Sequence, residues 1–206
     1  MQSYVTVKNH AEYEFEEKKS VFIADVFPVS TEVDALVYID GIRKKYPDAK
    51  HHVYAYVLRE NSIMRFTDDH EPQGTAGMPV LDVIRKNGCT DTLIVVTRYF
   101  GGTLLGTGGL VRAYTAAALG GLKQAQIITY DVYTTIEITV SYSDYQKISS
   151  GFDMFGFLVS SVDYSNEVKI TGSLLSSRFS EIQDAVVQTT AARAQIKVIE
   201  EKYDFR

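Results

Sequence analysis

The sequence of 206 residues has no tryptophan, four prolines and one cysteine. The single cysteine, Cys89, excludes an internal disulfide framework and is typical of a reducing compartment. No apolar run approaches the roughly 18 residues that a membrane-spanning helix needs. The N-terminus also lacks a basic region followed by an apolar stretch, which is the pattern of a secretion signal. We therefore expect a cytoplasmic protein without a membrane segment.

An excess of positive charge is also missing, since the formal net charge is −5. This charge argues against a protein that coats nucleic acid by electrostatic attraction alone. The distribution is uneven, however. Residues 77–125 carry five positive and two negative side chains, whereas the segments on both sides are net negative. An anionic partner is therefore expected to contact residues 77–125.

Residues 1–130 have the pattern of a mixed domain of strands and helices. Short runs that are apolar or alternate with period two indicate strands, and apolar residues at helical spacing indicate helices. The expected strands are residues 11–16, 21–29, 52–58, 62–66 and 92–97. The expected helices are residues 31–46, residues 79–86, and a third helix whose first turn is capped by Thr107.

Residues 131–206 have a simpler order of expected elements. The expected elements are a strand at 133–142, a helix at 143–155, a hairpin of strands 157–164 and 168–175, a helix at 180–193 and a strand at 195–199. The order β-α-β-β-α-β is that of a ferredoxin-like split βαβ unit. No Pro/Ser-rich linker separates the two halves, so we expect a short boundary near residues 125–132.

The most informative segment, residues 98–112, places five glycines and two arginines between an apolar strand and a helix. Glycines allow close approach of the backbone to a ligand, and the amide groups at a helix start favour negative charge. Arg98 and Arg112 add planar donor groups, so we expect one pocket in which both arginines face an anion. The residues predicted to bind this anion are Arg98, Tyr99, Gly101, Gly102, Gly106, Thr107, Gly108, Gly109 and Arg112.

A structural role is the alternative explanation of this segment. Glycine-rich turns also serve tight packing, and a buried arginine often pairs with a structural carboxylate. No Gly-Lys-Ser/Thr follows the glycines, so the segment is not a Walker loop. Its spacing also differs from that of the dinucleotide-binding turn.

A second motif places three carboxylates, Asp68, Asp69 and Glu71, before Gly74 and Thr75. Oxygen clusters of this kind bind hard cations, so a metal-dependent hydrolase is the alternative function. The structural alternative is that the acidic loop caps the following helix or pairs with Arg98 and Arg112. No recognisable spacing assembles a nucleophile, a base and an orienting residue. We therefore assign no catalytic residue, metal or cofactor, and consider an enzyme the less favoured class.

Three stretches, residues 68–77, 95–102 and 105–114, together closely resemble the YigZ/IMPACT family. The resemblance covers essentially the whole chain. It implies an α+β protein with a ribosomal protein S5 domain 2-like domain at 1–130 and a ferredoxin-like domain at 131–206. Such a pair of domains is also similar to the fourth and fifth domains of the translocating elongation factor.

The resemblance implies translation-linked regulation. Together with the local positive charge, it leads us to expect a protein that binds RNA or the ribosome through the first domain. A purely protein-binding regulator that uses the exposed sheet of the second domain is a further option. His70 and Gln73 depart from the family pattern, in which we expect glycine and serine. The eukaryotic relative regulates a kinase through an additional RWD domain that is not found in this sequence. Kinase regulation is therefore not among the expectations.

Overall fold

The computed structural model describes residues 3–205, which form two compact units. Residues 4–129 make up the first unit, and the residues from 130 onwards make up most of the second. Each unit has its own apolar core. Within the described residues, no helix combines the length and the apolar character that crossing a membrane requires.

The first unit consists of six strands and three α-helices, with a short 3₁₀ helix at Glu60–Ser62. In chain order the elements are β1 (Tyr4–Val7), β2 (Ala11–Glu17), β3 (Ser20–Pro28), α1 (Glu32–Lys45), β4 (His51–Val57), β5 (Met64–Thr67), α2 (Gly77–Lys86), β6 (Thr92–Tyr99) and α3 (Gly106–Ala125).

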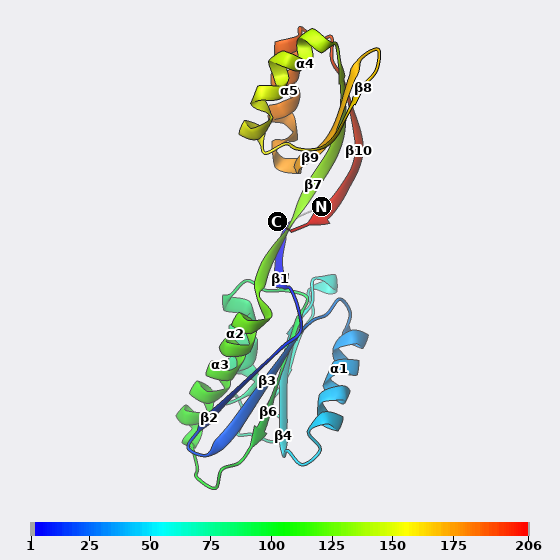
Figure 1. Cartoon of the computed structure of the whole chain (residues 1–206). Coiled ribbons are helices and arrows are strands. Elements are labelled where there is room, and N and C mark those ends of the chain that lie inside the picture. The colour runs from blue at the N-terminus through cyan, green and yellow to red at the C-terminus, as the bar shows by residue number, and fades with distance from the viewer. Residues whose placement is uncertain (1–2, 206) are drawn as a thin grey trace. The chain divides into compact units, whose positions relative to one another are not determined.

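Five of these strands form an antiparallel sheet in the order β2-β3-β6-β4-β5. The helix α1 covers one face of the sheet, and α2 and α3 cover the other (Figure 1). The sheet therefore lies between two apolar cores, which explains why β6, its central strand, is buried along almost its whole length. In this register Arg98, near the end of β6, lies opposite Phe22 of β3 and His51 of β4.

The second unit contains four strands and two α-helices. Its elements are β7 (Ile127–Val140, which belongs to this unit from residue 130 onwards), α4 (Tyr142–Ile148), β8 (Leu158–Tyr164), β9 (Val168–Leu175), α5 (Phe179–Thr190) and β10 (Gln195–Asp204), with 3₁₀ helices at Ser149–Phe155 and Ser176–Arg178. The strands pair in the order β10-β7-β9-β8, and every pair is antiparallel. Both units are therefore mixed α/β structures with antiparallel sheets.

The sequence pattern predicts most elements, but it misses some of their ends. The strand β7 begins at Ile127 rather than residue 133, and β10 continues to Asp204 rather than ending at 199. The β10 extension, from Glu200 to Asp204, pairs with β7 from Thr135 to Asp131. Their stability comes from backbone pairing between distant segments, so residue alternation does not reveal it. The strand β1 was not expected at all.

Candidate functional site

The acidic loop begins with a carboxylate that organises the start of α2. One oxygen of Asp68 accepts hydrogen bonds from the amides of Ala76 at 3.0 Å and Gly77 at 2.8 Å, and the other accepts from Gly74 at 2.8 Å. The residue just before the helix, Ala76, has no side chain that can cap it. Asp68 therefore supplies the cap and the favourable negative charge from outside the helix.

The next carboxylate fixes the loop to the neighbouring strand. Asp69 Oδ2 accepts a hydrogen bond from the backbone amide of His52 at 2.5 Å, and its carbonyl oxygen pairs with His51 Nδ1 at 2.8 Å. Because a carbonyl oxygen only accepts, His51 Nδ1 carries the proton of this hydrogen bond. Asp69 thus holds the acidic loop against the start of β4.

The third carboxylate, Glu71, lies at the centre of a buried polar cluster. Arg98 Nη1 donates to Glu71 Oε1 at 2.6 Å, and the Tyr114 hydroxyl donates to the same oxygen at 2.8 Å. His51 Nε2 lies 4.0 Å from this oxygen. The Arg98 and Glu71 side chains are only 6% and 4% exposed. Burial, together with the charge of Glu71, raises the pKa of the Tyr114 hydroxyl, so this group remains a donor.

One donor of Arg98 remains without a partner. Its Nη2 donates to Ser20 Oγ at 3.4 Å, but its Nε is buried and bonds to no other described residue. The guanidinium also lies 5.6 Å from the ring centroid of Phe100. Most buried polar atoms in proteins are hydrogen-bonded, so an unpaired arginine nitrogen requires an explanation.

The glycine-rich turn combines a packing role with an open helix start. The amide of Gly101 donates to Ser20 Oγ at 3.1 Å, and a Cβ on Gly101 would overlap the backbone carbonyl of Lys19. Only glycine therefore permits this approach of the two loops. Gly106 has a φ of +70° and starts α3. Because the helix begins there, Thr107 lies inside its first turn, and the prediction that Thr107 caps it is wrong.

A cavity of about 450 Å³ lies between the acidic loop, the end of β6 and the start of α3. Its polar lining comes from the side chains of Lys50, His51, Glu71 and Arg98 and from residues Gly106 and Thr107. Its apolar lining includes Phe100, Leu104, Leu105 and Leu110. No side chain in the described part of the chain caps the first turn of α3, so the amide groups of this turn are available to a ligand.

The comparisons with known proteins agree with the motifs that build this cavity. Residues 18–122 match the Impact N-terminal domain. The chain is 35% identical over 198 residues to the IMPACT family member YvyE of Bacillus subtilis, covering 96% of this chain and 91% of the relative. The chain belongs to the IMPACT family.

Other IMPACT relatives and one solved structure extend the comparison. The IMPACT family member YigZ of Escherichia coli is 30% identical over 187 residues, covering 89% of this chain and 92% of the relative. The IMPACT homolog of Dictyostelium discoideum is 37% identical over 94 residues, covering 44% of this chain and 27% of the relative. A crystal structure described as a hypothetical protein is 28% identical, with a TM-score of 0.61, covering 97% of this chain and 98% of the other.

The two arginines of the IMPACT motif do not share one cavity, contrary to the sequence-based expectation. Arg112 is exposed and lines a separate depression of about 240 Å³ together with Lys18 and Glu17. Arg98 is buried against Glu71. The structural alternative, pairing of an arginine with the acidic loop, therefore holds for Arg98 but not for Arg112. The Leu105 side chain lies between the two cavities and lines both.

The other residues of the predicted anion site and of the acidic loop occupy positions that serve the local structure. Tyr99 is half-buried at the end of β6 and does not line the cavity. Thr75 is buried and donates to the carbonyl of Pro72 at 2.6 Å, and Gly74 and Gly102 take positive φ values in their turns. Gly108 and Gly109 belong to the first turns of α3. Lys50 and Leu104 were not expected from the sequence, because a lone residue in a turn carries no distinguishing signal.

The three carboxylates of this IMPACT chain do not converge on one point. Asp68 faces the start of α2, Asp69 faces β4, and Glu71 faces Arg98 and Tyr114. Across residues 3–205, no group of three His, Cys, Asp or Glu side chains is arranged to hold a metal ion. The geometry therefore gives no specific support to the alternative of a metal-dependent hydrolase.

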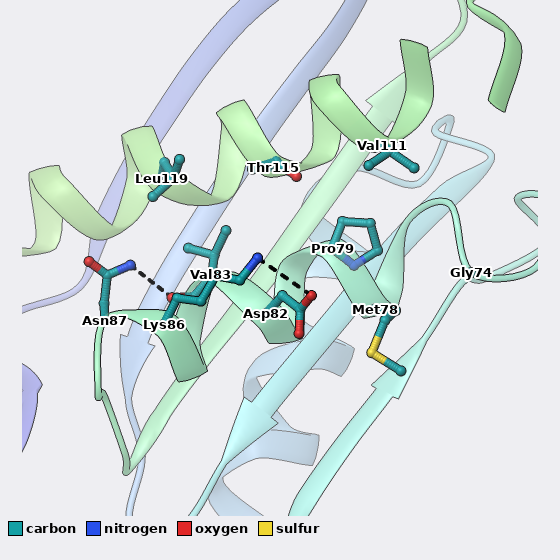
Figure 2. Close-up of a pocket in the computed structure, with 10 residues that line it drawn as sticks. All are labelled: Gly74, Met78, Pro79, Asp82, Val83, Lys86, Asn87, Val111, Thr115 and Leu119. Atoms are coloured by element: carbon teal, nitrogen blue, oxygen red, sulfur yellow. Dashed lines mark hydrogen bonds and ion pairs between the residues drawn. The ribbon is translucent and has the colours of Figure 1, made fainter. Parts of the chain in front are cut away.

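Another cavity of the first unit has a different chemistry. It measures about 310 Å³ and lies between α2 and α3, with apolar side chains that include Met78, Val111 and Leu119 (Figure 2). Its two charged residues, Asp82 and Lys86, pair with each other at 3.8 Å. The groove therefore offers apolar surface and no surplus positive charge, unlike the cavity at the start of α3.

Proposed function

We propose that this IMPACT-family protein is a translation-linked regulator that binds RNA or the ribosome through its first unit. One observation supports the proposal most, namely the cavity in which Lys50 and Arg98 lie beside the uncapped first turn of α3. Free amide groups at a helix start and cationic side chains both favour phosphate. A protein with this role belongs in the cytoplasm, and the single cysteine is consistent with that compartment.

The second depression extends the cationic surface along the helix start. Lys18 and Arg112 line it together with one carboxylate, that of Glu17, and Leu105 lines both this depression and the first cavity. A ligand with a single anionic group can occupy only one of the two cavities. A polynucleotide carries successive phosphates, so it is able to contact both. This arrangement favours RNA over a small anion.

The acidic character of the rest of the chain restricts where RNA can bind. The net charge is −5, and only residues 77–125 have a surplus of positive side chains. Repulsion elsewhere on the surface confines phosphate contacts to the region around α3. We therefore expect moderate, salt-dependent binding rather than extensive coating of nucleic acid.

The element order of the second unit also supports the fold assignment expected from the resemblance for that unit. In the second unit, the elements follow the order β7-α4-β8-β9-α5-β10 and the strands pair as β10-β7-β9-β8. This combination is expected for a ferredoxin-like unit. We assign the first unit to the S5 domain 2-like class on the family resemblance, so the proposed relation to elongation-factor domains rests on both assignments.

The proposal is tested by RNA binding as a function of salt concentration. The double variant Lys50→Ala/Arg112→Ala removes one exposed cation from each cavity and leaves the buried Arg98–Glu71 pair intact. Its salt slope, log K against log salt, should be smaller by about two, because each lost phosphate contact lowers the slope by about one. Fluorescence anisotropy with a labelled single-stranded RNA and co-sedimentation with ribosomes measure the effect.

A matched control has the same change in charge elsewhere in the first unit. Arg43 and Lys44 on α1 are exposed and lie outside both cavities. The variant Arg43→Ala/Lys44→Ala should bind as the unchanged protein does. Equal losses in the two double variants would contradict a localised site, and an absence of binding by the unchanged protein would contradict the function itself.

A further inference from the structure

The cavity at the start of α3 contains a free hydrogen-bond acceptor as well as its positive groups. Glu71 Oε1 is already occupied by Arg98 and Tyr114. No described residue donates to the other oxygen, Oε2, and Glu71 lines the cavity. A carboxylate oxygen accepts hydrogen bonds and does not donate them. A ligand in the cavity is therefore best matched to this carboxylate when it places a donor next to Glu71.

The same cavity also has a place for an anion. Lys50 lines it together with Gly106 and Thr107, which belong to the first turn of α3. Arg98 lines it as well, with a side chain that is only 6% exposed and an Nε that has no partner in the described structure. A helix start alone would be weak evidence, but the buried Arg98–Glu71 pair lines the same cavity and has one Glu71 oxygen that accepts from no described residue, which is an independent observation.

The apolar part of the lining is unusually open. Phe100 is 51% exposed and Leu104 is 84% exposed. The guanidinium of Arg98 lies 5.6 Å from the centre of the Phe100 ring, which helps to orient the ring. An oriented and exposed aromatic ring beside a phosphate site is a platform on which an unpaired base can stack.

A simple oxyanion does not satisfy these three features together. Sulfate would use the positive groups but would leave Oε2 without a donor. Phosphate can donate to Oε2 through its protonated oxygen, but like sulfate it would leave Phe100 without a neighbour. A deoxynucleotide offers a phosphate and a base but no hydroxyl at the 2′ position. An unpaired ribonucleotide offers a phosphate, a 2′-hydroxyl donor and a flat base.

We propose that this cavity is a subsite for one unpaired ribonucleotide, in which Glu71 accepts from the 2′-hydroxyl and Phe100 stacks on the base. This inference rests on the proposed function and makes it more specific. It implies that the protein discriminates RNA from DNA and prefers single strands to duplexes. A base within a duplex is stacked on its neighbours, so it is not available to Phe100.

The first test changes only the nucleic acid. Short single strands of the same sequence are prepared as RNA, DNA and 2′-O-methyl RNA, and their affinities are measured by fluorescence anisotropy. We expect RNA to bind about tenfold more tightly than the other two, since each of them lacks the 2′ donor to a charged acceptor. RNA duplex of the same sequence should bind more weakly than the single strand.

The second test changes the protein. Glu71→Gln keeps one acceptor oxygen for Arg98 and Tyr114 and replaces Oε2 with an NH2 donor, so it should reduce the RNA-to-DNA affinity ratio to about one. Its matched control is Glu32→Gln, because Glu32 also accepts a tyrosine hydroxyl, that of Tyr56, outside the cavity. Phe100→Ala should weaken binding of single-stranded RNA and DNA alike by about tenfold. Phe100→Tyr keeps the ring and should retain binding, and Phe66→Ala removes an exposed phenylalanine elsewhere.

The outcomes separate this inference from the proposed function. Salt-dependent binding of RNA, DNA and 2′-O-methyl RNA with equal affinity, unaffected by Phe100→Ala, would overturn the ribonucleotide subsite and leave general RNA binding intact. Equal binding of RNA and an acidic peptide would also overturn it, since it would show charge attraction alone. Failure to bind any nucleic acid would overturn both. If Glu71→Gln does not fold, the comparison of the three nucleic acids still decides the question.

Discussion

The guanidinium of Arg98 and the carboxylate of Glu71 form a buried ion pair at 2.6 Å, which joins the end of the central strand β6 to the acidic loop. Two motifs separated in the sequence therefore belong to one structural unit. Tyr114 of α3 donates to the same oxygen of Glu71, so the pair also anchors the helix. The pair thus positions the three walls of the cavity: the loop, the strand end and the helix start.

Removal of one member of this pair should destabilise the first unit strongly. Arg98→Met leaves the Glu71 carboxylate buried without its countercharge, which costs about 3–5 kcal/mol in comparable pairs. Hydrogen exchange of the β6 amides under native conditions and urea unfolding followed by circular dichroism measure the loss. The double variant Arg98→Met/Glu71→Leu should be more stable than Arg98→Met, because no charge is left unpaired. Additive losses in the double variant would contradict this view of the pair.

The sequence predicts which residues line the cavity better than it predicts how these residues contact one another. A strong apolar run predicts the strand β6 from the sequence alone. Thr31 and Asp34 form a capping box, which predicts the start of α1. The sequence also marks Arg98 and Glu71 as candidates. It offers their pairing only as one of the alternatives, because the contact joins residues 27 positions apart and no local pattern decides between a binding role and a structural role. Lys50 reaches the cavity only through the position of β4 in the sheet.

The glycines of residues 98–112 are a second case in which the sequence predicts the residues of the site but not the role of each one. All five glycines of residues 98–112 look equivalent as components of an anion-binding turn. In the structure Gly101 serves the close approach to Lys19, and its amide is occupied by Ser20. Gly106 instead provides a positive φ at the start of α3. These roles depend on which loop lies opposite each residue, and local sequence carries no information about that.

Two glycine substitutions should have opposite effects on stability. A Cβ on Gly101 would overlap the Lys19 carbonyl, so Gly101→Ala should displace the turn between β2 and β3 and cost about 1–3 kcal/mol. Gly41 lies in the interior of α1 with no atom within 4 Å of the same added carbon. Gly41→Ala should therefore stabilise the protein by up to about 1 kcal/mol. Urea unfolding of both variants checks the signs, and stabilisation by Gly101→Ala would contradict the close approach of the two loops.

The thiol of Cys89 should be unreactive in the folded protein. The residue is buried after α2, and burial raises the pKa of its thiol to about 11. The reactive thiolate is therefore scarce at neutral pH, and reagents have little access to it. Labelling with a thiol reagent should be slow in native buffer and complete in denaturant. Rapid labelling of the native protein would show that the segment around Cys89 opens readily.

The second unit should lose stability in acid through Asp144. This carboxylate is buried at the start of α4, and Arg193 donates to its two oxygens at 3.1 Å and 2.9 Å. Hydrogen bonds from Arg193 and then Lys147 lower the pKa of Asp144 to about 2, from an ordinary value of 3.8. A lowered pKa in the folded state means that folding favours the charged form. The contribution of Asp144 to the free energy of unfolding is therefore complete above about pH 4, and it is lost as the pH falls through about 2.

Asp144→Asn should remove this acid dependence and lower the stability of the second unit at neutral pH. The matched control is Asp184→Asn on α5, where the carboxylate is exposed and has no ion pair with another residue of the described chain. Urea unfolding of the full chain between pH 2 and pH 7, followed by hydrogen exchange of β7 and β9 amides, isolates the second unit. If the free energy of unfolding changed with pH in the same way for the unchanged protein and for Asp144→Asn, Asp144 would not be the source of the acid dependence. Arg193→Ala should remove only part of the pH dependence of the free energy of unfolding, because Lys147 still donates to the Asp144 carboxylate at 3.0 Å.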